Sequence, residues 1–196
     1  MEYSAGLMSH MFWLAETRIT AEKMCDGLSQ DAIRELAVSE NIFQMKNTTR
    51  ASRNFSAIYN RLSNMPFPLV EMIAKGDAAI AKVLVLISMM KTDKLFFEFI
   101  YEVYRGKIIL GEKIIASRDI ILFFNEKETQ SEVIASWSDT TKKKLKQVYI
   151  RSLFEAGLLS DTKECKILPA YVDYRARNVL ESNDMTIYYY AITGEK

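Results

Sequence analysis

Cysteine, glycine and proline are scarce in this chain of 196 residues. Two cysteines, Cys25 and Cys165, are too few for a disulfide framework, and they lack the spacing of metal ligands. A cytoplasmic protein with two buried thiols is the economical interpretation. Because there are only seven glycines and three prolines, the sequence predicts long helices with short connections.

A hydrophobic run long enough to cross a membrane is also missing. The most apolar stretch, 78–90, would form about 20 Å of helix, against roughly 30 Å of hydrocarbon to be crossed. Lys82 interrupts it. The N-terminus carries Glu2 and no basic segment, so it does not read as a signal peptide. We therefore predict a buried core helix at 78–90 and no membrane association.

Motifs for catalysis and cofactor binding are absent from the sequence. It contains no Gly-rich phosphate loop, no nucleophile elbow and no HExxH motif. The single histidine, His10, lies in an apolar context that is typical of a structural residue. Glu126, Glu128 and Glu132 have no histidine or acidic companion that would complete a metal site. We expect a non-enzyme without catalytic residues, cofactor or metal.

Positive charge is present and segregated, although the net charge is only +1. Residues 41–70 contain four bases and no acid, and residues 140–154 contain five bases and no acid. Such windows are either solvated surfaces or contacts for an acidic partner. Apolar residues make up 49% of the chain, enough for a sizeable core around which these windows can be displayed.

The first basic window coincides with a predicted pair of helices. Ser29 or Asp31 begins a short helix, and a longer helix follows over 48–62 with Phe55, Ile58 and Leu62 on its inner side. Three arginines fall on the opposite side of this longer helix: Arg50, Arg53 and Arg61. A short helix, a connection and a basic helix form the outline of a helix-turn-helix, whose arginines would contact nucleic acid. The alternative is a surface helix whose arginines pair with acids elsewhere in the protein.

The second basic window lies in a fuller version of the same outline. Helices are expected from Ser117 to Asn125, over 129–137, and from a cap at Ser138 or Asp139 to Gly157. Residues 157–168 have apolar ends around a polar turn, as a short β-hairpin would. The pattern predicts a winged helix-turn-helix, and the β-branched and aromatic run 186–193 predicts an added strand.

The third of these helices has an unusual distribution of charge. Its outward residues are Lys143 and Gln147, and the remaining bases flank them: Lys142, Lys144, Lys146 and Arg151. The basic N-terminal half and the apolar C-terminal half match a recognition helix, which projects at one end and is anchored at the other. A solvated lysine face is the alternative.

The chain as a whole is predicted to be mainly α, with helix-turn-helix-like elements, a winged-helix-like C-terminal part and a small hairpin or sheet. A first helix is expected from a cap at Ser9 to near Gly27. Three parts are expected, either separate or packed as one unit: a helical part at 1–65, a packing hub at 66–115 and the winged-helix-like part at 116–196.

Several stretches together resemble the BrxA family of bacteriophage exclusion (BREX) defence systems. They are YSAGLMSHMFWLAE, ENIFQMK, MMKTDKLFFEFIYEVYR and FFNEKETQSEVIASWSDTTKKKLKQVYIRSLFEAGLL. The likeness runs from Tyr3 to Leu159, whereas the tail MTIYYYAITGEK has no counterpart. It implies a cytoplasmic, helical, non-catalytic protein that works beside methyltransferase, ATPase and phosphatase-like components. The family is also likened in fold to the RNA binder NusB and is thought to bind DNA.

Three hypotheses for the function follow. The leading one is a non-enzymatic component that binds double-stranded DNA through the two basic helices. The second is a scaffold whose basic helices dock on acidic surfaces of another BREX subunit. The third is RNA binding on NusB-like lines.

Overall fold

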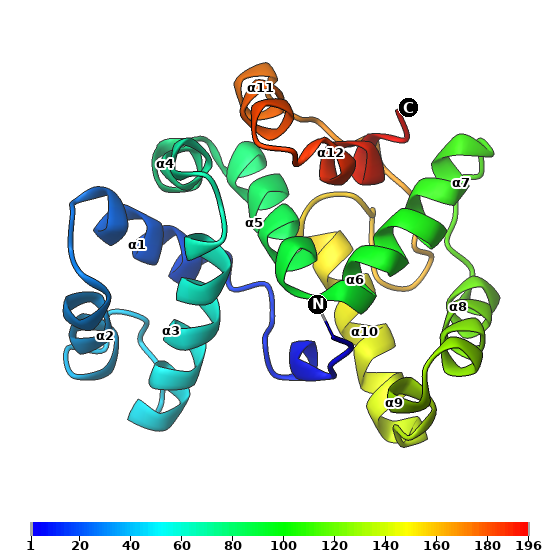
Figure 1. The fold of residues 1–196 in the computed structure, drawn as a ribbon, viewed down its shortest axis with the longest axis horizontal. Coiled ribbons are helices and arrows are strands. Elements are labelled where there is room, and N and C mark those ends of the chain that lie inside the picture. Colours follow the sequence, from blue (N-terminus) through cyan, green and yellow to red (C-terminus); the bar gives the residue numbers. More distant parts are fainter. Residues whose placement is uncertain (1, 196) are drawn as a thin grey trace.

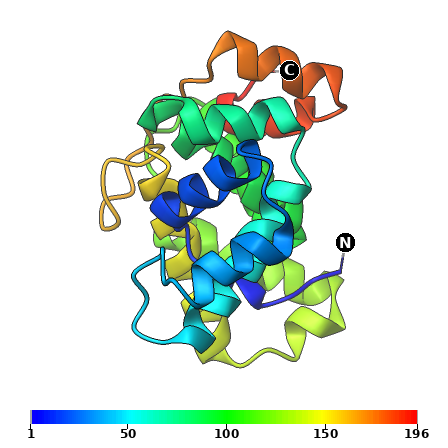
Figure 2. The ribbon, with the colours of Figure 1, turned by 90° about the vertical axis from the view of Figure 1, so that its left-hand side faces the viewer.

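The computed structural model describes residues 2–195 and consists mainly of helices, as predicted (Figure 1). One end of the molecule is formed by the helices α1 (Leu14–Cys25), α2 (Gln30–Val38) and α3 (Thr48–Ser63), whereas the 3-10 turn η1 (Gly6–Met8) lies nearer the centre and contacts α10 (Asp139–Glu155). Helices α1, α2 and α3 contact one another pairwise, and Figure 2 views the molecule from this end.

Side-chain caps set the starts of α2 and α3. The Ser29 hydroxyl accepts a hydrogen bond from the Ala32 amide at 3.3 Å, so the predicted cap of α2 is confirmed. The Asn47 side chain accepts from the Arg50 amide at 2.8 Å and begins α3. Both helices therefore begin where a short polar side chain satisfies an amide that has no partner within the helix.

The prediction of a helix starting at Ser9 is wrong, because α1 begins at Leu14. Arg61 on α3 explains the difference. Its guanidinium donates to the backbone oxygens of His10 and Met11 at 2.7 and 2.8 Å, and it lies 5.6 Å from the centre of the Trp13 ring. These contacts hold residues 10–13 in a non-helical path beside α3.

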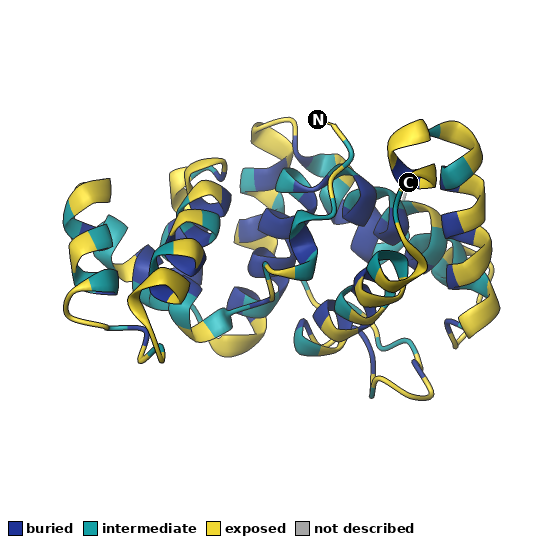
Figure 3. Ribbon diagram, turned by 90° about the horizontal axis from the view of Figure 1, so that it is seen from below, coloured by how far each residue is buried: buried dark blue, intermediate teal, exposed yellow. Residues whose placement is uncertain are grey.

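The centre of the fold is a long hydrophobic helix. It is α5 (Ala78–Thr92), which follows α4 (Phe67–Lys75) and is capped by Asp77, whose side chain accepts from the Ile80 amide at 3.0 Å. Residues 83–90 are all buried, and Figure 3 shows the buried positions concentrated on the inward sides of the helices. The predicted core helix at 78–90 is thus confirmed. No helix within residues 2–195 is long and apolar enough to span a bilayer.

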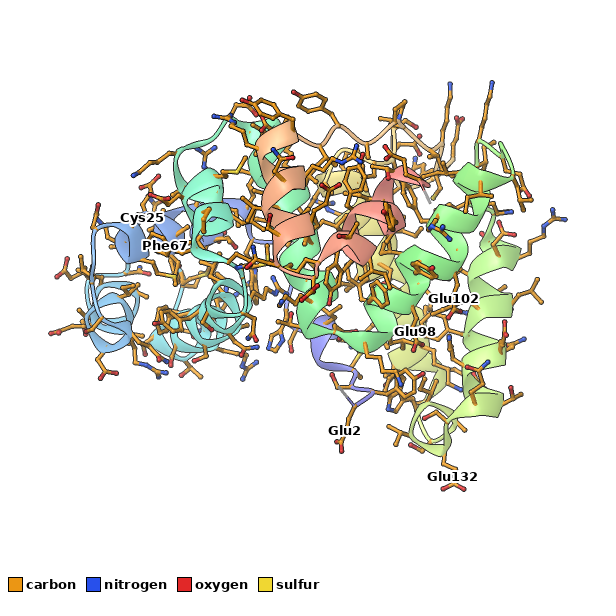
Figure 4. The ribbon with its side chains drawn as sticks, turned by 45° about the horizontal axis from the view of Figure 1, so that its top comes forward. Glu2, Cys25, Phe67, Glu98, Glu102 and Glu132 are labelled. Carbon is orange, nitrogen blue, oxygen red and sulfur yellow. The ribbon has the colours of Figure 1, made fainter. Side chains whose placement is uncertain are left out.

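A continuous helical segment follows α5 and carries two acids that pair with a buried lysine. It comprises α6 (Lys94–Glu98), the π-helical η2 (Phe99–Tyr104) and α7 (Arg105–Ile109). Glu98 and Glu102, labelled in Figure 4, pair with Lys127, which is buried on α8 (Ser117–Gln130), with Nζ–Oε distances of 2.9 and 2.6 Å. The Tyr3 hydroxyl donates to Glu98, so this cluster joins the N-terminal segment and α8 to the central helices.

The remaining helices are α8 (Ser117–Gln130), α9 (Glu132–Ala135), α10 (Asp139–Glu155), α11 (Tyr174–Ser182) and α12 (Thr186–Thr193). The prediction that Ser138 caps α10 is confirmed, because its hydroxyl accepts from the Thr141 amide at 3.2 Å. Gly157 adopts the predicted left-handed conformation after α10, with φ of 81°.

The β-hairpin predicted at 157–168 does not form, and residues 2–195 contain no strand. The chain does reverse there, because the Ser160 amide donates to the Lys166 oxygen and the Leu168 amide to the Leu158 oxygen, each at 2.9 Å. Pairing is limited to the isolated bridges 159–167 and 114–166. Cys165, with φ of 51°, interrupts the extended conformation that a second strand would need.

The strand predicted at 186–193 is also wrong, because these residues form α12. Tyr189, Ala191 and Ile192 are buried in the main core, at positions that a helix brings to one side. β-Propensity mostly expresses how a side chain fits its surroundings, and here packing against α5 and α11 overrides it.

Replacement of Arg61 by methionine should destabilise the protein. The backbone oxygens of His10 and Met11 would lose a charged donor, and we expect the free energy of unfolding to fall by about 2 to 3 kcal/mol in urea titrations. Arg53→Met on the exposed side of the same helix is the matched control and should change it by less than about 0.5 kcal/mol. Equal effects of the two substitutions would contradict the structural role of Arg61.

Asp93 at the start of α6 makes stability depend on pH. Burial raises the pKa of Asp93 to about 6, although the Phe96 amide and Arg61 oppose the shift. The native state therefore binds the proton more tightly than the unfolded state, and stability falls as pH rises from about 4 to about 6. Asp93→Asn keeps the capping oxygen and removes this titration.

We expect the variant to gain about 1 to 3 kcal/mol relative to the parent protein between pH 4 and pH 7, measured by urea unfolding. Asp77→Asn, at the exposed cap of α5, is the control and should gain less. A variant whose relative stability does not change with pH would show that Asp93 is not desolvated.

Candidate nucleic-acid interface

The outward face of α3 presents arginines and hydroxyl groups. Phe55, Ile58 and Leu62 face the interior, which turns Arg50 and Arg53 outward, and both are exposed. Four hydroxyl residues occupy the same N-terminal half of the helix: Thr48, Thr49, Ser52 and Ser56. The face combines two guanidinium groups with several neutral hydrogen-bond donors, and no acid occurs on α3.

A shallow depression of about 450 Å³ lies where this half of α3 meets the end of α2. Val38 and Arg53 line it together with the four hydroxyl residues. Arg34 on α2 adds a further base, since its guanidinium donates to the Ser56 hydroxyl at 3.5 Å. Arg34 is not predicted from the sequence, because its neighbours in the chain include Asp31 and Glu35 and no acid-free window contains it.

The prediction that Arg61 belongs to this outward face is wrong. Its residue surface is 3% exposed, and burial lowers the pKa of its guanidinium to about 10. Helical periodicity alone does not show that Arg61 is buried. The N-terminal segment covers a side of α3 that would otherwise face solvent, and this contact depends on the tertiary structure. Of the three predicted arginines, Arg50 and Arg53 are therefore on the surface. Asn54, on the same helix, is buried as well.

The basic residues of α10 have diverse surroundings. Leu145, Tyr149 and Leu153 are buried and form the inner side of the helix. The predicted contact residues that are exposed are Lys143, Lys144, Gln147 and Arg151. Arg151 also pairs with Glu155, with Nε 2.6 Å from Oε1.

Lys142 and Lys146 are held within the protein. Lys142 Nζ lies 2.9 Å from Glu128 Oε1, and its side chain is 12% exposed. Lys146 Nζ lies 5.3 Å from the centre of the Phe124 ring, within the range of a cation–π contact. The lysine run therefore offers less free positive charge than its sequence indicates.

The two basic helices lie on either side of α5 (Figure 1). The outward face of α3 is at one end of the molecule. In contrast, Lys144, Gln147 and Arg151 on α10 line a cavity of about 960 Å³ whose walls come from other segments. A helix that enters the major groove has to project from its surroundings, and α3 meets this condition better than α10 does.

The helix-turn-helix outline is only partly present. Residues 39–47 connect α2 to α3, which is longer than the usual turn of three or four residues. Asn41 organises this loop by accepting from the Met45 amide at 2.7 Å and donating to the Met45 oxygen at 3.0 Å. The winged-helix prediction gains no support from the structure, because the hairpin that would form the wing lacks strands.

His10 and the two cysteines have structural surroundings. Burial and the nearby Arg61 lower the pKa of His10. Cys165 is buried as predicted, Cys25 is partly exposed, and both thiols are free. Within residues 2–195, no group of three histidine, cysteine, aspartate or glutamate side chains is placed to hold a metal ion.

Comparisons with known proteins match most of the chain. The BrxA family model matches residues 1–184. BREX protein BrxA of Bacillus cereus is 40% identical over 161 residues, which cover 82% of this chain and 80% of that protein. BREX protein BrxA of Paramagnetospirillum magneticum is 24% identical over 182 residues, or 93% of this chain and 92% of the relative. The crystal structure of an uncharacterized protein from Magnetospirillum magneticum has the same fold, with a TM-score of 0.86 over the whole of both chains at 22% identity.

Proposed function

The chain belongs to the BrxA family of BREX phage-defence proteins, and we propose that it acts there as a non-enzymatic component that binds double-stranded DNA. It would do so in the cytoplasm beside other components of the system, among them methyltransferase, ATPase and phosphatase-like subunits. Helix α3 makes the principal contact in this proposal, and α10 makes a second one.

The exposed N-terminal half of α3 is the observation that carries the proposal. Arg50 and Arg53 can each bind a phosphate or a guanine edge through two hydrogen bonds, and hydroxyl groups beside them can donate to phosphate oxygens. Ile58, Arg61 and Leu62 anchor the C-terminal half in the protein. A helix that is polar and free at its N-terminal end and buried at the other has the asymmetry of recognition helices.

The exposed lysines of α10 supply backbone contacts in this proposal. Lys143 and Lys144 act as point charges toward phosphates, so they add affinity with little preference for sequence. Lys142 and Lys146 contribute less, since Glu128 and the Phe124 ring already hold them. If Lys46, Arg50, Arg53 and Lys143 each neutralised one phosphate, log K would fall with log salt at a slope of about −4.

Alanine at Arg50 or Arg53 should weaken duplex binding without unfolding the protein. Each change removes a phosphate or base contact, and we expect a loss of roughly tenfold in affinity and a salt slope smaller by about 1. Fluorescence anisotropy of labelled duplex DNA at several salt concentrations measures both quantities.

Arg118→Ala is the matched control for these substitutions, because Arg118 is an exposed arginine at the start of α8, at the far end of the molecule from α3 (Figure 1). It should leave the affinity for duplex DNA within about twofold. Unchanged binding by the Arg50 and Arg53 variants, with intact circular dichroism, would rule out α3 as the contact.

Reversal of charge at Lys143 tests the second contact. Lys143→Glu should weaken duplex binding about equally for unrelated sequences, because a phosphate contact carries no sequence information. Lys75→Glu on α4 is the control, since Lys75 is also exposed but lies on neither basic helix. If both variants bind duplex DNA like the parent protein, α10 plays no part in DNA binding.

The same titrations distinguish duplex DNA from the other partners. Nuclease-treated protein that prefers structured or single-stranded RNA would support the NusB-like alternative. Protein that binds no nucleic acid near physiological salt but forms a stoichiometric complex with another BREX subunit would support the scaffold alternative.

A further inference from the structure

A hollow lies over the outward face of α10. It has a volume of about 960 Å³, near the upper end of the range for sites that bind small molecules or peptide segments. Its other walls are the N-terminal residues 8–12, the segment 114–121 and the loop 162–165. DNA binding by α3 does not use this cavity.

Large apolar side chains from separate segments converge on the cavity while remaining accessible to solvent. Met11, Ile114 and Ile121 line it and are 43%, 51% and 46% exposed. A single exposed apolar residue is ordinary, but a group that gathers in one concavity is typical of a binding site. The occupant should therefore bring apolar groups of its own.

Bases dominate the polar part of the lining. Lys144 and Arg151 come from α10 and Lys163 from the facing loop, whereas Glu164 is the one acid that lines the cavity among residues 2–195. Within the same residues, Lys144 and Lys163 form no ion pair. The charge of the lining therefore favours an anionic occupant.

The spacing of the polar groups indicates more than one anion. Lys144, Gln147 and Arg151 recur at the intervals that bring residues to one side of a helix, and Lys144 and Arg151 are roughly 10 Å apart along its axis. Two anions at that separation can engage one residue each. Acidic side chains on successive turns of a second helix have the matching spacing, and the apolar side chains between them would meet Ile114 and Ile121.

We propose that this cavity docks an acidic amphipathic helix of a partner protein. Duplex DNA would supply the anions but no bulky apolar side chains for the cavity, and a fatty acid would supply the apolar group but only one anion. The helix brings both. Its apolar side fills the hollow, and its carboxylates pair with Lys144 and Lys163 and share Arg151 with Glu155.

The test uses the full-length protein and a fluorescein-labelled helical peptide with Leu and Ile on one side and Glu on the other. Anisotropy titrations compare the parent protein with Ile121→Glu and Leu122→Glu. Leu122 is the next residue on α8, is 63% exposed and does not line the cavity, so it controls for adding a carboxylate to this helix. Thermal unfolding checks that both variants fold equally well.

Ile121→Glu should weaken peptide binding by at least about tenfold, because it places an acid among apolar and acidic groups of the bound peptide. Leu122→Glu should stay within about twofold, and a peptide with Lys in place of Glu should not bind. Equal effects of the two variants, equal binding of the basic peptide, or no binding of the acidic peptide would overturn the proposal.

Two further measurements separate this inference from other possibilities. Arg50→Ala and Arg53→Ala on α3 do not alter the lining of the cavity and should leave the affinity for the acidic peptide unchanged, so failure of peptide docking is distinguishable from failure of DNA binding by α3. Dodecanoate that binds the parent protein but not Ile121→Glu, without any binding of the acidic peptide, would overturn the proposal in favour of an anionic amphiphile.

Discussion

The apolar helix α5 is the constraint on which the rest of the structure depends. Residues 83–90 are all buried, so this helix has no side that water can cover favourably. Helices α1, α3, α4, α6, α10 and α12 all contact it. The need to enclose α5 therefore determines which side of each surrounding helix is apolar, and it leaves the outer sides of α3 and α10 free to carry bases.

Charged residues inside the fold join segments that the apolar core alone would hold less specifically. Arg61 binds the backbone of residues 10 and 11, and Lys127 pairs with Glu98 and Glu102 while Tyr3 also binds Glu98. Both arrangements attach the N-terminal segment to helices that come much later in the chain. Because buried charges are costly without partners, each of these contacts tolerates few alternative positions for that segment.

The division of roles between α3 and α10 follows from what surrounds them. The free half of α3 lies at the end of the molecule, with hydroxyl groups beside its two exposed arginines. The outward face of α10 lies in a cavity whose other walls bring apolar side chains, Lys163 and Glu164. The free half of α3 suits a large polyanion such as duplex DNA. The cavity beside α10 suits an elongated partner that brings apolar groups as well as acids. In these two proposals α3 serves DNA alone, whereas α10 carries both the second DNA contact at Lys143 and Lys144 and one wall of the cavity.

The sequence by itself determined the class of fold, the central helix, the caps at Ser29, Asp77 and Ser138 and the two basic windows, because each depends on local spacing, on a neighbouring side chain or on composition. Only the tertiary structure decided which bases are free. Arg61 has the same local spacing as exposed residues, but the N-terminal segment covers it, and Lys142 is held by Glu128. The run 186–193 shows the same limit, since its β-forming residues become a helix where the packing of the core requires one. The cavity could not be foreseen either, because four segments distant in sequence form it and their proximity is set by packing around α5.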